Sequence, residues 1–213
     1  MVFYIDSSSY TEIEHALENV WVKGITTNPT IINKNRDSTE DILKRLSHYP
    51  IEEVFYQIKS TNIKIMLEEL KMAQKILENK LVVKIPPTEM GFKFAGLISN
   101  QHPICITAVF SLSQALIAKE IGASYIAIYI NRASKLLEDS TFFAKNMSLV
   151  LCGSKTDIIA ASIKSPRELH DTALAGIDHF ALPFKVFDSL YKHPGSIQAV
   201  EKFDENGKYL IKQ

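Results

Sequence analysis

The chain has 213 residues, of which 46% are hydrophobic and 23% are charged, so it can bury a sizeable apolar core and does not have the composition of a disordered protein. Lysine and arginine number 24 and are matched by 24 aspartate and glutamate residues. This balance argues against nucleic acid and membrane surfaces as partners, because no net positive field attracts a polyanion.

Eight short apolar segments rich in β-branched and aromatic residues alternate with longer segments of helical periodicity. This alternation is typical of parallel βα units rather than hairpins. The predicted strands cover residues 2–6, 23–28, 54–58, 81–86, 104–110, 125–131, 158–163 and 179–184.

Helix-start signals follow several of these strands directly. A serine followed three residues later by glutamate or glutamine is typical of a capping box, which satisfies free N–H groups of the first helical turn. Such pairs are Ser9 with Glu12, Ser111 with Gln114, and Ser165 with Glu168. After the third predicted strand, apolar residues recur every three or four positions, which predicts an amphipathic helix. They are Met66, Leu70, Ala73 and Leu77.

We predict one α/β domain over residues 1–213, a single (β/α)8 TIM barrel, because no linker rich in proline, glycine or serine divides the chain. The alternative, an open doubly wound sheet, usually has only five or six strands. Residues 194–213 form a tail after the last unit. Ile197, Val200 and Phe203 have helical spacing there, so we expect an extra C-terminal helix. It packs either on the barrel or on a neighbouring subunit, and the second arrangement implies a homo-oligomer.

The sequence predicts a cytoplasmic protein. Cys105 and Cys152 are its two cysteines, a usage typical of a reducing compartment rather than of a disulfide framework. The segment MVFYIDSSSY lacks the basic and apolar regions of a signal peptide, and no window has the length and apolar character of a membrane span.

Polar residues end the predicted strands, at the edge where barrels of this type build their sites. They are Asp6, Thr26, Asn28, Gln57, Lys84, Thr107, Tyr129, Asn131 and Ser162. Because side chains alternate along a strand, an inward Lys84 places Val82 inward as well. The same rule predicts that the barrel interior also contains Tyr4, Cys105, Ala127 and Ala160.

Lys84 lies between apolar residues in the segment LVVKIPP, so its position needs an explanation. Burial of the amine at a barrel mouth favours its neutral form, which attacks a ketone to form a Schiff base. The iminium then accepts electrons from a neighbouring carbon–carbon bond as that bond breaks. Two structural alternatives are an ion pair with Asp6 and an outward position at the margin of the sheet.

Four other residues at the strand ends suit the acid–base steps of such a reaction. Asp6 is a candidate base for the hydroxyl proton of the departing carbon, with a helix cap as its structural alternative. Gln57, Thr107 and Tyr129 are candidates for holding a water molecule and for protonating the enamine carbon. Taken singly, each of these three residues also suits ordinary hydrogen bonding in a core.

Arg132 follows the sixth predicted strand, and Ser162 and Lys164 lie at the end of the seventh, where barrels commonly bind phosphate. A helix N-terminus at Ser165 lies close to them in the sequence, and such termini attract anions. These residues therefore predict a phosphorylated substrate. Ordinary surface charge is the alternative for Lys164 and, less readily, for Arg132.

None of the six histidines ends a strand or has the spacing of a metal-ligand pair, and GxGxxG, P-loop and GxSxG motifs are absent. We therefore expect no metal and no cofactor. Two alternatives to a Schiff-base enzyme stay open. One is a phosphate-binding isomerase or decarboxylase that uses Lys84 only electrostatically, and the other is an inactive barrel that binds phosphosugars.

Seven segments follow one another in a specific order: FYIDSS, GITTNPTII, FYQI, VVKIPPTEMG, ITAVFS, YINR and AASIKSPRE. Together they resemble the small transaldolase family, in particular its fructose-6-phosphate aldolase-like branch. The resemblance covers most of the chain, and TTNPTII and VVKIPPTE are its most specific parts.

The resemblance implies a (β/α)8 barrel in which Lys84 on the fourth strand forms the Schiff base. It implies that Asp6 takes the hydroxyl proton during cleavage, and that Thr26 and Asn28 position the lysine and the dihydroxyacetone part of the substrate. It further implies that Arg132 and Ser162 bind the phosphate. The implied partners are sugar phosphates, dihydroxyacetone and other copies of the chain, commonly ten in a ring in which the C-terminal helix reaches an adjacent subunit.

Family members that transfer the three-carbon unit resemble this chain less at two positions, since they carry Glu in place of Gln57 and Phe in place of Tyr129. The resemblance therefore favours an aldolase that reversibly cleaves fructose 6-phosphate to dihydroxyacetone and glyceraldehyde 3-phosphate. The alternative is a transaldolase of the pentose phosphate pathway. It converts sedoheptulose 7-phosphate and glyceraldehyde 3-phosphate to erythrose 4-phosphate and fructose 6-phosphate.

Overall fold

The computed structural model describes residues 1–136 and 139–207, and within them eight parallel strands close into a barrel in the order of the sequence. This closed barrel confirms the predicted (β/α)8 fold. The strand limits differ from the predicted ones by at most two residues. The strands are β1 (Val2–Asp6), β2 (Val22–Thr26), β3 (Glu53–Gln57), β4 (Leu81–Ile85), β5 (Ile104–Val109), β6 (Tyr125–Tyr129), β7 (Asp157–Ala161) and β8 (His179–Leu182).

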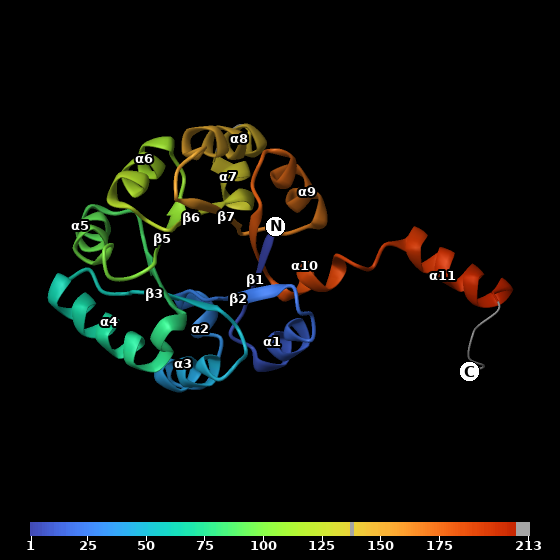
Figure 1. Ribbon diagram of the computed structural model, residues 1–213, viewed down its shortest axis with the longest axis horizontal. Coiled ribbons are helices and arrows are strands. Elements are labelled where there is room, and N and C mark those ends of the chain that lie inside the picture. The colour runs from blue at the N-terminus through green and yellow to red at the C-terminus, as the bar shows by residue number, and fades with distance from the viewer. Residues whose placement is uncertain (137–138, 208–213) are drawn as a thin grey trace.

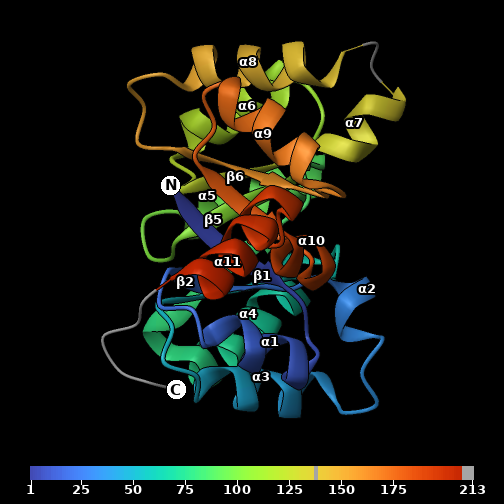
Figure 2. The same cartoon turned by 90° about the vertical axis from the view of Figure 1, so that its right-hand side faces the viewer.

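Helices surround the barrel, and the β2–β3 and β6–β7 connections each contain two of them. The helices are α1 (Tyr10–Leu17), α2 (Pro29–Ile32), α3 (Thr39–Ser47), α4 (Ile63–Leu77), α5 (Glu89–Ile98), α6 (Leu112–Ile121), α7 (Ile130–Leu136), α8 (Ser140–Leu151), α9 (Pro166–Leu174), α10 (Phe184–Ser189) and α11 (Pro194–Asn206). Figure 1 shows them as a ring around the strands. In the view of Figure 2, the strands lie between α6, α8 and α9 on one side and α1, α3 and α4 on the other.

Side-chain caps fix where most of these helices begin. Ser111 and Ser165 each accept a hydrogen bond from the N–H group three residues later, as predicted. Ser9 stands at the N-cap of α1, but its side chain makes no cap bond. Ser7 instead accepts from the N–H group of Ser9 and donates to the carboxylate of Glu12.

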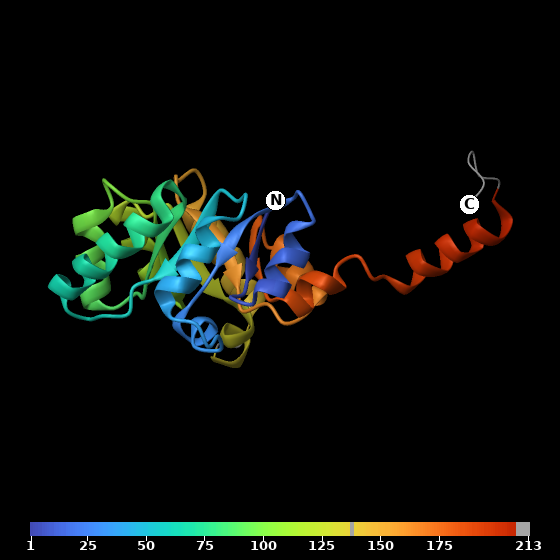
Figure 3. The ribbon, with the colours of Figure 1, turned by 90° about the horizontal axis from the view of Figure 1, so that it is seen from below.

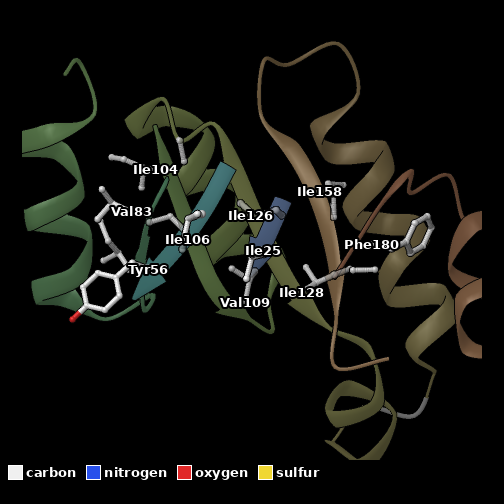
Figure 4. Close-up of a cluster of buried hydrophobic side chains, with 14 of the residues drawn as sticks. Ile25, Tyr56, Val83, Ile104, Ile106, Val109, Ile126, Ile128, Ile158 and Phe180 are labelled. Carbon is white, nitrogen blue, oxygen red and sulfur yellow. The ribbon is translucent and has the colours of Figure 1, made fainter. Parts of the chain in front are cut away.

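Side chains of the strands alternate between two buried layers. The outer layer lies between strands and helices, and Figure 4 labels part of it, including Val83, Ile106 and Ile126. The inner layer fills the barrel and contains Tyr4, Phe55, Val82, Cys105, Tyr125, Ala127, Ile159, Ala161 and Ala181. The predicted inward positions on β1, β4, β5 and β6 are therefore confirmed.

The prediction of which β7 side chains face the barrel interior is wrong. Ala160 belongs to the outer layer, whereas Ile159 and Ala161 belong to the inner layer. Ser162 nevertheless faces the interior side, because its backbone has a φ of 60° and interrupts the alternation. Ala108 has the same φ of 60°, at an irregularity in the pairing of β5 with β6. Left-handed backbone at these two non-glycine residues thus shapes the carboxyl end of the barrel.

Glu53 organises the opposite, amino-terminal end of the barrel. Its carboxylate accepts hydrogen bonds from the hydroxyl groups of Tyr4 at 2.9 Å and Tyr125 at 2.6 Å, and the Nζ atom of Lys23 lies 3.2 Å away. Burial and the charge of Glu53 raise the pKa of Tyr4, so the phenol stays a donor. This network closes the bottom of the barrel, on strands that are far apart in sequence.

Glu53→Ala is expected to lower the free energy of unfolding by about 2–4 kcal/mol, because two phenols lose a charged acceptor and Tyr4 is fully buried. Urea denaturation measures the change. The matched control is Glu52→Ala, whose side chain is 75% exposed, and it should change the stability by less than about 0.5 kcal/mol. Equal effects of the two substitutions would contradict a special role for the Glu53 network.

Helix α11 confirms the predicted C-terminal helix, but it does not pack on its own barrel. Figures 1 and 3 show it extending away from the rest of the chain. Ile197, Val200 and Phe203 are 49%, 54% and 67% exposed. The last part of the predicted tail, residues 208–213, lies outside the described residues. Among the described helices, none combines the length and the apolar character that crossing a membrane requires.

Candidate active site

A cavity of about 210 Å³ opens at the carboxyl ends of the strands. Its inner wall consists of apolar and small side chains, namely Phe55, Cys105, Ala127, Ile159, Ala161 and Ala181. Polar and charged side chains form its rim, as expected for the active end of a (β/α)8 barrel.

Eight of the ten predicted site residues line this cavity. They are Asp6, Thr26, Asn28, Lys84, Tyr129, Arg132, Ser162 and Lys164. Thr107 is connected to the cavity through Tyr129, because the two hydroxyl oxygens lie 3.3 Å apart. Gln57 is not brought to this group and lines a neighbouring cavity with Pro86 and Thr88. Gln57 is the last residue of β3 and pairs with Lys84 of β4 in the sheet register, so its strand neighbours alone do not account for this placement.

Lys84 is buried in the middle of the barrel mouth, with 5% of its surface exposed. Its Nζ atom donates a hydrogen bond to the backbone carbonyl of Thr27 at 2.8 Å. No carboxylate lies within ion-pair distance of Lys84 in the part of the chain that the structure describes. The two structural alternatives, an ion pair with Asp6 and an outward position, are therefore wrong.

The segment after β2 fixes the carbonyl group that Lys84 contacts. Thr27 is fully buried, and both its N–H group and its hydroxyl donate to the carbonyl of Phe55. Asn28 caps α2 by accepting from the N–H group of Ile31 at 3.0 Å, and Pro29 suits the first helical position. The TTNP sequence thus orients the backbone carbonyl of Thr27 toward Lys84, and the side-chain oxygen of Asn28 is used to cap α2.

Asp6 lines the same cavity as Lys84 and is half-buried. Thr26 donates its hydroxyl to Oδ1 of Asp6 at 2.7 Å. Desolvation raises the pKa of Asp6, and the positive charge of Lys84 and the Thr26 hydrogen bond oppose this effect. Asp6 caps no helix, so the geometry is that of a carboxylate free to accept a proton.

Tyr129 forms a small cluster on the β5–β6 side of the cavity. Phe110 packs edge-on against its ring, with centroids 5.9 Å apart. The guanidinium group of Arg132 lies 4.9 Å from the ring centroid of Tyr129, within the range of a cation–π contact. Arg132 follows Tyr129 by three residues, so the first turn of α7 brings it over the ring.

Glu168 holds together the loops that carry the cationic side of the cavity. Its carboxylate accepts from Nδ2 of Asn131 and from the N–H group of Lys164, both at 2.7 Å. Ser165 caps α9, so the hydroxyl of that residue is already used. The side chains of Arg132, Ser162 and Lys164 are left to line the cavity. Two cations and a hydroxyl suit a phosphate group.

Two further polar or charged residues of the cavity wall were not predicted from the sequence. Thr30 and Lys34 line the cavity from α2 and the segment after it, and the apolar Pro183 lines it after β8. Lys34 does not follow a strand, so no local signal marks it. The short helix α2 returns the chain over the barrel mouth, and only the folded structure brings Lys34 there. Within the described residues, no group of three or more histidine, cysteine, aspartate or glutamate side chains is arranged to hold a metal ion.

Comparison with known proteins identifies the family. The model of the transaldolase/fructose-6-phosphate aldolase family matches residues 3–212. The chain belongs to this family. A protein of Lactiplantibacillus plantarum named probable transaldolase is 32% identical over 98% of this chain and 97% of its own. A protein of Aquifex aeolicus with the same name is 32% identical over 95% of this chain and 94% of its own.

The transaldolase/fructose-6-phosphate aldolase fold is also found in distant solved structures. The orotidine 5'-monophosphate decarboxylase of Metallosphaera sedula superposes with a TM-score of 0.61 over 96% of this chain and 97% of its own. The sequence identity is 11%, so this likeness concerns the barrel alone. Family membership confirms the resemblance seen in the sequence segments around Asp6, Lys84 and Arg132 and identifies the chain as a member of an enzyme family.

Proposed function

We propose that this enzyme uses Lys84 to form a Schiff base with a phosphorylated ketose. The observation that carries the proposal is a buried lysine that lines a cavity, has a carbonyl as its hydrogen-bond acceptor and shares that cavity with the carboxylate of Asp6. Family membership supports the same chemistry. An amine in this position is poised to attack a ketone.

The proposed reaction balances with the groups present. The neutral amine of Lys84 adds to the ketone carbon, and loss of water gives the iminium. Asp6 takes the proton of the hydroxyl two carbons away, the carbon–carbon bond breaks, and its electron pair forms the enamine as an aldehyde leaves. The enamine then either attacks a second aldehyde or takes a proton and is hydrolysed to free dihydroxyacetone.

We assign the phosphate of the substrate to Arg132, Ser162 and Lys164. The guanidinium group and the ammonium group line one side of the cavity and suit a dianion. Thr26 positions Asp6 by its hydrogen bond, and Asn28 acts through α2, whose first turn borders the cavity. In this proposal, Thr107 orients the hydroxyl of Tyr129, and Gln57 acts from the neighbouring cavity.

Transfer of the three-carbon unit is our first assignment, because the relatives that match nearly the whole chain are named probable transaldolases. Release of dihydroxyacetone, the aldolase reaction, is the second. It is favoured by the hydroxyl of Tyr129, which lines the cavity and can assist protonation of the enamine.

The two assignments differ in their need for an acceptor. Purified protein is incubated with fructose 6-phosphate, with and without erythrose 4-phosphate, and glyceraldehyde 3-phosphate is measured. Transfer predicts that this product forms only with the acceptor. Cleavage predicts that it forms without the acceptor, together with free dihydroxyacetone.

Tyr129→Phe is expected to raise the ratio of transfer to release by about tenfold or more, because it removes a proton donor from the cavity. The ratio is measured from the same two incubations. Thr107→Val is the control, since it removes the hydrogen-bond partner and keeps the phenol, and it should move the ratio less. An unchanged ratio in Tyr129→Phe would exclude the phenol as the group that decides release.

We also propose a cytoplasmic homo-oligomer in which α11 contacts an adjacent copy. The exposed apolar side chains of Ile197, Val200 and Phe203 support the contact between copies. The two free cysteines support the reducing compartment of the cytoplasm. A chain that ends at residue 192 should show a smaller number of subunits in light scattering than the full chain. An unchanged number would refute a role for α11 in assembly.

A further inference from the structure

Glu168 and Asn131 do not line the active-site cavity, yet they connect the two segments that carry its cationic side. Glu168 is half-buried in the first turn of α9. Asn131, in the first turn of α7, donates its amide N–H to Oε1 of Glu168 at 2.7 Å. The backbone N–H group of Lys164 donates to Oε2 at the same distance. One carboxylate therefore joins the segments that follow β6 and β7, two neighbouring strands.

The contacts of Glu168 differ from those of an ordinary capping box. In that motif, the glutamate reaches back to the N–H group of the N-cap residue, which is Ser165 in α9. Ser165 does accept from the N–H group of Glu168, as the motif requires. The carboxylate, however, accepts from Lys164, one residue before the cap, and from Asn131 of a different helix. The side chain therefore fixes α9 to α7 rather than only starting α9.

The carboxylate of Glu168 does not neutralise the cations of the cavity. Both of its oxygens accept from amide N–H groups. Within the described residues, neither Arg132 nor Lys164 forms an ion pair, and both side chains are exposed. Their charges are therefore available to an anion, and the placement of the two backbone segments decides how well both cations meet it.

We propose that Glu168 and Asn131 are positioning residues for the phosphate group of the substrate. The proposal rests on the proposed function, which assigns the phosphate to Arg132, Ser162 and Lys164. The hydrogen bond between Glu168 and Asn131 sets the distance from Arg132 on α7 to the segment after β7. Cations that are held in place lose less conformational entropy when they bind a ligand, so this hydrogen bond raises the affinity for phosphate.

Calorimetry with inorganic phosphate tests the proposal without turnover. Glu168→Ala should weaken the binding by about tenfold, because the cations are no longer aligned on one anion. Removal of a negative charge alone would strengthen the binding of an anion, so the sign of the change separates positioning from electrostatics. Asn131→Ala leaves the charge unchanged and should also weaken the binding. The double substitution should weaken it no more than Glu168→Ala does, since both residues act through one hydrogen bond.

Kinetics with fructose 6-phosphate separates positioning from a role in stability alone. Glu168→Ala should raise KM about tenfold and change kcat by less than about twofold, because the phosphate is remote from the reacting carbons. Dihydroxyacetone has no phosphate and should be trapped on Lys84 by borohydride at the native rate. Glu168→Gln keeps one acceptor oxygen and should bind phosphate more tightly than Glu168→Ala. The control is Asp171→Ala, whose carboxylate bonds to Arg167 of the same helix, and it should change none of these values.

Phosphate binding that is unchanged or tighter in Glu168→Ala would overturn the proposal, as would an equal weakening in Asp171→Ala. If Glu168→Ala does not fold, Asn131→Ala provides the test, and native affinity in that variant overturns the proposal. A native protein that is never trapped on Lys84 contradicts the proposed function instead. Phosphate binding is measured without an imine, so the two failures are distinguishable.

Discussion

Lys84→Met is expected to abolish turnover of fructose 6-phosphate, with a loss of at least about four orders of magnitude in kcat, because no other amine among the described residues is buried in the cavity wall to form the imine. The methionine side chain keeps the apolar stem and removes only the nucleophile. Initial rates of glyceraldehyde 3-phosphate formation measure the loss, with the acceptor aldehyde present.

Trapping identifies the reason for this loss. Incubation of the native protein with dihydroxyacetone and borohydride should add mass to the peptide that contains residue 84, and the variant should show no addition. Circular dichroism and the retained affinity for inorganic phosphate provide the folding control. A variant that keeps substantial activity would exclude any catalytic role of Lys84. A native protein that is never trapped, with an inactive variant, would instead favour a reaction that uses Lys84 only electrostatically.

Asp6→Asn is expected to lower kcat by about two to four orders of magnitude, because the base for the departing hydroxyl is lost. Asparagine keeps an oxygen to accept from Thr26, so the local structure is preserved. Imine formation precedes the step that needs Asp6. The variant should therefore still be trapped on Lys84, which distinguishes a missing base from a collapsed site. Loss of both activity and trapping would contradict this assignment.

The dependence of kcat/KM on pH provides a second test of Asp6 as the catalytic base. Burial raises the pKa of its carboxyl group, and the base works only when it is deprotonated. The acid limb of kcat/KM should therefore lie at a higher pH than an ordinary aspartate gives. The hydrogen bond from Thr26 opposes the shift, so Thr26→Val should raise the pKa of Asp6 further and move this limb to still higher pH. An acid limb that moves to lower pH in Thr26→Val would refute the effect of Thr26 on the pKa of Asp6.

The same raised pKa has a consequence for stability. A carboxyl group whose pKa is higher in the folded state than in the unfolded state destabilises the fold once it is ionised. Asp6→Asn should therefore be more stable than the native protein at neutral pH. This difference should disappear as the pH falls below the unfolded pKa, where Asp6 is protonated in both states. Urea denaturation at several pH values measures it, and Asp37→Asn, at an exposed site, is the control.

The strands and most of the rim could be predicted from the sequence because their signals are local. An apolar run of alternating side chains fixes which residues share a face, so Lys84 and Val82 were placed inside from their own strand alone. Repetition of this pattern eight times fixed the barrel. Capping residues such as Ser111 and Ser165 marked helix starts for the same reason.

The sequence by itself thus determined the barrel, the inward lysine and the polar edge around it, since each depends on neighbours within a few residues. Only the tertiary structure decided the partners: the Thr27 carbonyl beside Lys84, the return of Lys34 over the mouth, and the separation of Gln57 from Tyr129. It also decided the phase of Ser162, through a left-handed backbone conformation that alternation does not predict. These features depend on contacts between residues far apart in the chain, and such contacts leave no periodic pattern in a single sequence.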